Sequence, residues 1–240
     1  MRSSNPVFRT LERQQTFVSA EQASYRGITL KTGLLLLVAV VSGFLFLNAF
    51  ETITVENFFG IFFGAFIVAL ISVIVATRSV RLALPFSLLY AAAEGIILAV
   101  ITVFFEAMYP GVALAAVITT GAIFTVMLFL YSSRTIRVTS RMRRIMYTIL
   151  ISILVMSVIS LFLPNIFFNP DSPFALIISG ALVLFGAFML TLDFDRAEMV
   201  VESGADRAYE WMVAVGLMVT IVWIYLELLR FLAILNSRRN

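Results

Sequence analysis

The sequence contains no cysteine and no histidine among its 240 residues. Without cysteine the chain forms no disulfides, thiolate metal sites or thiol nucleophile. Without histidine it has no imidazole metal ligand, no serine–histidine triad and no side chain that ordinarily titrates near neutral pH. Any response to pH near neutrality would therefore fall to buried carboxylates.

Charge is also scarce. Only 13% of the residues are charged, whereas 61% are hydrophobic and the mean hydropathy is +1.03. Soluble domains are about a quarter charged and about 45–50% apolar. The chain is therefore an integral membrane protein with no room for a large soluble domain. Its net charge of +3 comes from arginines on connecting segments, so it reports topology and does not indicate nucleic-acid binding.

Apolar runs of about twenty residues, long enough to cross a bilayer, occur seven times. They cover residues 30–50, 58–76, 82–105, 112–131, 145–163, 174–192 and 211–235. We therefore predict an all-α integral membrane protein with seven transmembrane helices. Its parts are a cytosolic N-terminal segment (1–29), a transmembrane domain (30–235) and a short tail (236–240). The N-terminal segment either lies on the membrane surface or is a disordered tail.

Basic residues are distributed unevenly between the connecting segments. With the N-terminus inside, 14 of the 17 lysines and arginines lie in or next to inside segments, and the three outside loops contain none. This pattern predicts a multi-pass protein of the cell (inner) membrane with a cytoplasmic N-terminus. Arg238 and Arg239 then lie outside, unless the last helix does not cross fully.

Ionisable groups inside apolar runs are expensive, at about 2.5–3.5 kcal/mol, and often mark functional sites. Glu94 lies deep in the third run, and Glu227 lies in the last run, three residues before Arg230. The Glu227–Arg230 spacing favours a structural ion pair. Glu94 fits equally a hydrogen-bonded structural carboxyl or a proton or cation site. The helical rise allows Glu94 and Glu227 to share one level and one site.

Asp193 and Asp195 stand where the sixth apolar run stops. Two residues apart on a helix, they point to nearly opposite sides, so only one can face the bundle. We expect Asp195 to face the bundle, and Asp193 to face outward or toward the headgroups. The alternative is that both belong to an ordinary solvated helix end.

No pattern points to an enzyme. An intramembrane aspartyl protease needs aspartates on two spans, whereas Asp193 and Asp195 share one helix end. A rhomboid-like serine protease needs a histidine. A retinal protein needs a lysine deep in its last helix, but the only lysine is Lys31 at the start of the first run. We therefore expect no catalytic residue, no resident cofactor and no firm metal site.

Several short motifs occur in order along nearly the whole chain. They are LDFD at 192–195, LELLRFL at 226–232, NPVF at 5–8, LKTG at 30–33, EG at 94–95, and the stretch 209–227. LDFD resembles an F/Y-D ending of a sixth span, and LELLRFL resembles a closing L-x-L-L-R-x-L. Together the motifs resemble the Bax inhibitor-1 family, also called the transmembrane Bax-inhibitor-motif family, and most closely a bacterial branch of it.

The resemblance implies six helices that surround a central C-terminal helix. It also implies a pH-sensitive calcium leak controlled by two aspartates near the cytosolic side. By motif position, one family aspartate matches Asp195, and the gating arginine matches Arg78, so an Arg78–Asp195 salt bridge would close the pathway. The second aspartate falls at Thr220. Glu227 supplies an acid at a different depth.

The leading hypothesis is thus a pH-sensitive leak channel for cations, with Ca²⁺ as the ion. Oxygen ligands would come from the ion-pathway and pH-sensing residues Asp195, Glu94, Glu227, Thr220 and Asp193. An alternative is a non-conducting membrane regulator that binds membrane proteases or other membrane proteins, and a third is a proton-coupled transporter. We expect the lipid bilayer and other membrane proteins as partners, no nucleic acid, and Ca²⁺ only as a transient ligand.

Overall fold

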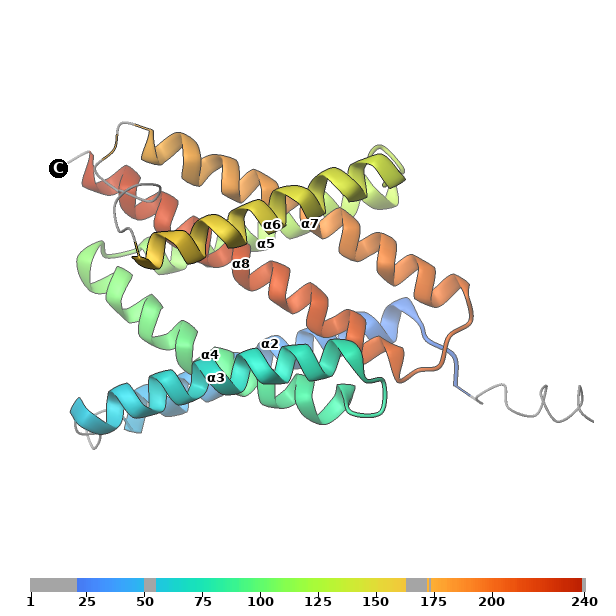
Figure 1. Cartoon of the computed structure of the whole chain (residues 1–240), viewed down its shortest axis with the longest axis horizontal. Coiled ribbons are helices and arrows are strands. Elements are labelled where there is room, and N and C mark those ends of the chain that lie inside the picture. Colours follow the sequence, from blue (N-terminus) through green and yellow to red (C-terminus); the bar gives the residue numbers. More distant parts are fainter. Residues whose placement is uncertain (1–20, 50–54, 163–171, 173, 239–240) are drawn as a thin grey trace, which may run out of the picture.

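The computed structural model describes residues 21–49, 55–162, 172 and 174–238, and the structural statements below concern this part of the chain. It contains seven helices, shown in Figure 1: α2 (Tyr25–Ala49), α3 (Val55–Arg78), α4 (Ala83–Met108), α5 (Val112–Ser132), α6 (Ser140–Phe162), α7 (Ala175–Glu202) and α8 (Tyr209–Ser237). Each is long and apolar enough to span a membrane. The predicted all-α, seven-span architecture is confirmed.

The helices extend beyond the apolar runs. α2 begins at Tyr25 and α6 at Ser140, and α7 continues to Glu202 although its apolar run stops at Leu192. Residues 193–202 contain good helix formers such as alanine, methionine, arginine and glutamate, so backbone hydrogen bonding continues where hydropathy falls. Hydropathy therefore marks the part of a helix that suits lipid, and it does not mark the end of the helix.

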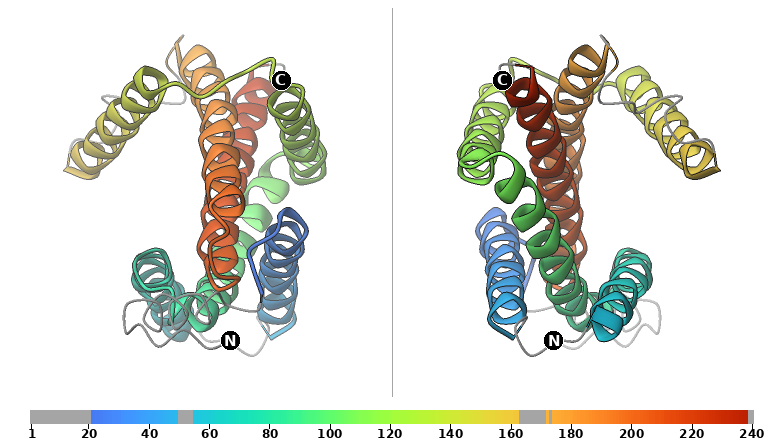
Figure 2. Two further views of the ribbon diagram at one scale, coloured as in Figure 1. Left: turned by 90° about the vertical axis from the view of Figure 1, so that its right-hand side faces the viewer. Right: turned by 90° about the vertical axis from the view of Figure 1, so that its left-hand side faces the viewer.

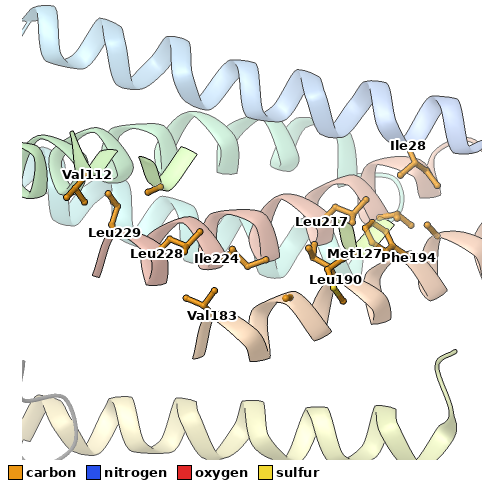
Figure 3. Packing of buried hydrophobic residues seen from close by; sticks show 14 residues of the cluster. Ile28, Val112, Met127, Val183, Leu190, Phe194, Leu217, Ile224, Leu228 and Leu229 are labelled. Atoms are coloured by element: carbon orange, nitrogen blue, oxygen red, sulfur yellow. The ribbon is translucent and has the colours of Figure 1, made fainter. Parts of the chain in front are cut away.

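The last two helices supply most of the core. α8 packs against α7, α2, α5, α4 and α3, while α6 packs against α7. Figure 3 shows Leu217, Ile224 and Leu228 of α8 among Val183 and Leu190 of α7. In both views of Figure 2, α6 stands away from the other helices. The resemblance implies six helices around α8, and five of them contact it in the described structure.

α2 and α4 approach each other closely. Ser42 Oγ donates a hydrogen bond to the carbonyl of Ala92 on α4 (2.9 Å). A Cβ at Gly95 would collide with the Ala39 carbonyl oxygen and with Ser42 Oγ. A Cβ at Gly43 would lie 2.7 Å from the Gly95 oxygen. Glycine is therefore required on both sides of this contact, which we call the α2–α4 seam.

Because successive helices alternate in direction, the start of α2 and the connectors 79–82, 133–139 and 203–208 lie at one end of the bundle, on the right in Figure 1. We call it the basic end. Of the basic residues that the structure describes, all except Arg230 and Arg238 lie at or near it.

Glu210 joins the first and last helices at the basic end. Its side chain is 1% exposed and accepts hydrogen bonds from the backbone N–H of Ser24 (2.7 Å), from Ser24 Oγ (3.1 Å) and from Lys31 Nζ (2.7 Å). Ser24 also caps α2, since Gly27 N–H donates to its hydroxyl (3.0 Å). Lys31 Nζ lies 5.0 Å from the centre of the Trp211 ring, within range for a cation–π contact. We call this group of contacts the Glu210 clamp.

A second link lies just outside the clamp. Ala23 N–H donates to the Ala205 carbonyl (2.8 Å), and the guanidinium of Arg207 donates to the Glu21 carboxylate. This hydrogen bond and the nearby negative charge raise the pKa of Arg207 above its usual value. The connector 203–208 is thereby tied to the chain that leads into α2.

Candidate functional site

The candidate site lies between α7 and α8. Asp193 is 8% exposed and faces α8, where Thr220 Oγ1 donates a hydrogen bond to Asp193 Oδ2 (2.5 Å). Gly216 lies one turn before Thr220 and next to this pair. A Cβ at Gly216 would lie 4.0 Å from Asp193 Oδ1, so the absence of a side chain leaves space beside the carboxylate. The two side chains form a polar contact inside a largely apolar interface, with Leu190 and Leu217 in the surrounding core.

Arg196 brings a positive charge next to this site. A Cβ at Gly216 would lie 3.8 Å from Arg196 Nη1, so the guanidinium and Asp193 border the same glycine. Arg196 lies one turn beyond Asp193 on α7, and its Nη2 donates to the hydroxyl of Tyr147 on α6 (2.9 Å). The surroundings of Asp193 are therefore connected to α6 as well as to α8.

Asp195 does not face α8. Its carboxylate accepts a hydrogen bond from Nη2 of Arg143 on α6 (2.5 Å), and its side chain is 20% exposed. The predicted divergence of the two aspartates is seen, because α7 remains helical through both. The assignment of sides is wrong, since Asp193 faces the bundle. Thr220 supplies a hydroxyl donor on α8, and Arg143 supplies a cation on α6, so each aspartate lies opposite its own partner.

The implied salt bridge between Arg78 and Asp195 is also corrected. Arg78 is the last residue of α3, which packs against α4 and α8 in the described structure and has no contact with α7. Asp195 pairs instead with Arg143. The match of Asp195 to the family aspartate loses its geometric support, since Asp193 is the aspartate that lies opposite Thr220.

Glu94 and Glu227 are not brought together. A hydrogen bond between Thr102 and the hydroxyl of Tyr225 (2.8 Å) fixes the register of α4 against α8. From this contact, Glu94 is displaced toward the basic end and Glu227 toward the other end, which separates them by roughly 15 Å of helix rise. The shared site that their sequence depths allowed is therefore not formed.

Glu227 keeps an unusual position of its own. Its Oε2 is buried and has no hydrogen-bond partner among the described residues. The ion pair of Glu227 with Arg230 stays a prediction. The backbone carbonyl of Glu227 accepts a long hydrogen bond from Ser179 Oγ (3.5 Å). The roles of Glu94 and Glu227 in an ion pathway stay predictions.

Sequence reasoning missed Gly216, Arg196 and Arg143. Gly216 and Thr220 are one turn apart on α8 and must share a face. Their neighbourhood could therefore have been predicted from their spacing. Arg196 follows Asp193 by three residues, so its position near Asp193 could have been predicted in the same way. The position of Arg143 could not have been predicted, because nothing in the sequence aligns α6 against α7.

The site is poor in metal ligands. The described residues contain no group of three or more aspartates or glutamates placed to hold a metal ion. Calcium prefers about six to eight oxygen ligands, whereas Asp193 and Thr220 supply only a few. The arrangement suits proton exchange or the transient contact of a passing cation better than a resident metal.

Comparison with known proteins places the chain in a family. A comparison with curated proteins gave no match. Residues 5–237 match the sequence model of a family described as Bax inhibitor 1 like. The matched region includes all seven helices and the Asp193–Thr220 pair. Because the match covers nearly the whole chain, the protein belongs to the Bax inhibitor 1 like family.

Proposed function

We propose that this protein is a cation leak channel whose conduction depends on pH, with Ca²⁺ as the principal ion. Family membership supports a membrane protein of the Bax-inhibitor kind, and conduction, Ca²⁺ and pH sensing are what the proposal adds. The observation that carries it is the buried Asp193 carboxylate, hydrogen-bonded by Thr220 at the contact of α7 with α8. A buried ionisable group in a membrane bundle marks an ion or proton pathway by default.

Thr220 gives this site two hydrogen-bonding states. With Asp193 charged, Thr220 Oγ1 donates to the carboxylate (2.5 Å). With Asp193 protonated, the acid becomes the donor, and Thr220 accepts its hydrogen. The threonine can then turn its own hydrogen to the Gly216 carbonyl, which lies 3.4 Å away. Protonation thus reverses a hydrogen bond between α7 and α8 and removes the charge that attracts a cation.

The arginines near the site would set how easily a cation reaches it. Arg196 borders Gly216 beside Asp193 and donates to Tyr147 on α6. Arg143 holds Asp195 from the same helix. We place the closing contact of the pathway at these α6–α7 links, in the role that the resemblance gave to Arg78.

Flux through purified protein in liposomes tests the proposal. Indicator dyes for Ca²⁺, K⁺ and H⁺ would be read over a pH series for the wild type, Asp193→Asn and the matched control Asp195→Asn. We expect Asp193→Asn to remove the pH-dependent part of the Ca²⁺ flux. Asp195→Asn breaks the contact with Arg143, so it should raise the flux but keep its pH dependence. An unchanged pH profile in Asp193→Asn would contradict the role of this carboxylate. Absence of flux for every ion would contradict the channel and favour the non-conducting regulator.

We also propose that the basic end faces the cytoplasm of a cell (inner) membrane, since positive charge is retained on that side. Ser133 lies exposed in the 133–139 connector of a chain without cysteine. A Ser133→Cys variant in intact cells should resist a membrane-impermeant thiol reagent and react after permeabilisation. Reaction before permeabilisation would reverse the orientation.

A further inference from the structure

A large groove separates α2 from α5. Its volume is about 1440 Å³, and its walls come from these two helices, with α4 and α8 behind them and α7 at one end. The described parts of α2 and α5 make no contact with each other. Figure 2 shows the two helices on the same side of the bundle with a separation between them. We call this cavity the α2–α5 groove.

The interior of the groove is apolar along most of its length. Leu36, Val40, Leu98, Val117 and Ile221 are among the side chains that line it. Three of the four threonines in its walls donate their hydroxyl hydrogens to carbonyls 2.7–2.9 Å away in their own helices: Thr29, Thr32 and Thr120. The fourth, Thr102, shares a hydrogen bond with the hydroxyl of Tyr225 (2.8 Å). The interior therefore offers few free donors to water or to an ion and suits a hydrocarbon chain.

Two glycines widen the groove. Gly33 of α2 and Gly121 of α5 line it, and a Cβ at either would meet no atom within 4 Å. Elsewhere on α2, Gly43 is closely covered by Gly95 of α4. The open space beside Gly33 and Gly121 lies within the groove, whereas the similar space beside Gly60 and Gly64 of α3 does not.

Charges of both signs gather where the groove meets the basic end. Arg134 and Arg137 come from the 133–139 connector, and Asp195, Glu198 and Glu202 come from the last turns of α7. Asp195 is already paired with Arg143. Glu198 accepts a hydrogen bond from the hydroxyl of Tyr131. Arg134, Arg137 and Glu202 are exposed and form no ion pair with any residue that the structure describes.

The backbone at Arg134 adds to this observation. Arg134 has φ of 56°, which makes it the one residue other than glycine with a positive φ in the described structure. Such a conformation costs a residue with a Cβ roughly 1–2 kcal/mol, and glycine usually occupies it. The hydrogen bonds from Arg134 N to the Tyr131 carbonyl and from Thr135 N to the Leu130 carbonyl show that this conformation ends α5 and places Arg134 at the groove mouth.

We propose that the α2–α5 groove binds one phospholipid whose headgroup carries a phosphate, a primary amine and no further charge, that is, a phosphatidylethanolamine. One acyl chain lies along the apolar interior, as a lipid that enters sideways from the bilayer would place it. The phosphate lies at Arg134 and Arg137, and the ammonium lies at Glu202 and Glu198.

Charge complementarity selects this occupant. A phosphatidylglycerol headgroup satisfies the arginines but leaves the carboxylates facing a net negative lipid. A choline headgroup satisfies the charges but has no N–H donor for the carboxylates. A purely apolar occupant would offer no charged partner to the arginines and carboxylates at the end of the groove. Only the amine-bearing zwitterion meets both signs with hydrogen bonds.

Lipid retention tests the proposal. The full chain would be reconstituted in an equimolar mixture of phosphatidylethanolamine, phosphatidylglycerol and phosphatidylcholine, purified in mild detergent, and examined by native mass spectrometry. We expect one phosphatidylethanolamine per chain. Gly121→Leu fills the groove and should lower its retention by about tenfold, which corresponds to the loss of about two buried methylene contacts. Gly33→Leu, from the opposite wall, should act in the same direction.

The matched control is Gly64→Leu. A Cβ at Gly64 on α3 also meets nothing within 4 Å, but this residue does not line the groove, so retention should stay at the wild-type level. Equal retention in Gly121→Leu, Gly33→Leu and Gly64→Leu would overturn the proposal. A change of oligomeric state in Gly121→Leu, with no lipid retained by the wild type, would assign the groove to a second copy and also overturn it.

Further variants test which headgroup the groove binds. Arg134→Gln with Arg137→Gln should lower phosphatidylethanolamine retention several-fold. Arg141→Gln with Arg144→Gln, which alters exposed arginines of the same region that do not line the groove, should leave it unchanged. Glu202→Gln should shift the preference toward phosphatidylglycerol. A wild-type preference for phosphatidylglycerol, or equal effects of the two arginine pairs, would overturn the headgroup assignment.

Discussion

The two flanks of α2 use glycine in opposite ways. Toward α4, Gly43 and Gly95 lie where a Cβ would meet the neighbouring backbone. Toward α5, Gly33 and Gly121 face open space in the groove. The same residue type therefore lies at a close helix contact on one flank of α2 and beside an open groove on the other. Small residues in a membrane helix indicate close packing only where a partner's backbone fills the space beside them.

The largest effect should come from the Glu210 clamp, which ties the start of α2 to the start of α8. Glu210→Ala leaves Lys31, itself 13% exposed, without its carboxylate partner. Breaking a buried ion pair typically costs about 3–5 kcal/mol, and we expect about 3 kcal/mol because Lys31 also donates to the Arg207 carbonyl (3.2 Å). Unfolding by sodium dodecyl sulfate in mixed micelles measures this cost. Glu202→Ala, in an exposed position, is the control, and equal stability of the two variants would contradict the prediction.

The seam itself should give the next largest effect. Gly95→Ala places a methyl group against the Ala39 carbonyl and Ser42 Oγ. Overpacking of this kind costs about 1–3 kcal/mol, and here the backbone of α2 must move to accept it. The same unfolding assay should therefore separate Gly95→Ala clearly from the wild type. A wild-type unfolding curve would show that the seam is looser than the structure describes.

A smaller effect is expected from the hydrogen bond across the seam. Ser42→Ala removes the donor to the Ala92 carbonyl and should cost about 1 kcal/mol. Because Ser42 Oγ is also one of the atoms that a Cβ at Gly95 would meet, the double variant with Gly95→Ala should be less destabilised than the sum of the single variants. Strict additivity in this double-mutant cycle would show that the two residues do not share a contact.

The open flank should give the smallest effect, and of opposite sign. Gly121→Ala and Gly33→Ala meet no neighbouring atom and replace glycine inside a helix, which is less favourable than alanine by about 0.5–1 kcal/mol. We expect a gain of about 0.5 kcal/mol for each in the unfolding assay. Destabilisation as large as that of Gly95→Ala would remove the contrast between the two flanks.

Much of the fold was predictable because the bilayer imposes a length and an apolar composition on each span. The number and order of the helices follow from the apolar runs. The continuation of α7 to Glu202 does not, since helix propensity and not hydropathy decides it. The two flanks of α2 were equally hidden, because Gly33 and Gly43 are both small residues in one apolar run.

The candidate site was predictable only as a set of residue types. The spacing of Asp193 and Asp195 required that they diverge, but the choice between them depends on which neighbouring helix supplies a donor. Thr220 on α8 and Arg143 on α6 make that choice, and they lie 27 and 52 residues from their partners. Contacts over such separations depend on how the helices are arranged in the membrane, which local sequence patterns do not contain.

The Glu210 clamp also orders events during biosynthesis. Ser24 and Glu210 are 186 residues apart, whereas the Ser42–Ala92 contact spans 50. During synthesis, the α2–α4 seam can form once α4 is inserted. The ammonium of Lys31 has no carboxylate partner until Glu210 is made at the start of α8. A chain released early would hold the seam and expose an uncompensated lysine at the membrane boundary. The contacts of Lys31 with Glu210 therefore require α8, and they form only after all the helices before it have been made.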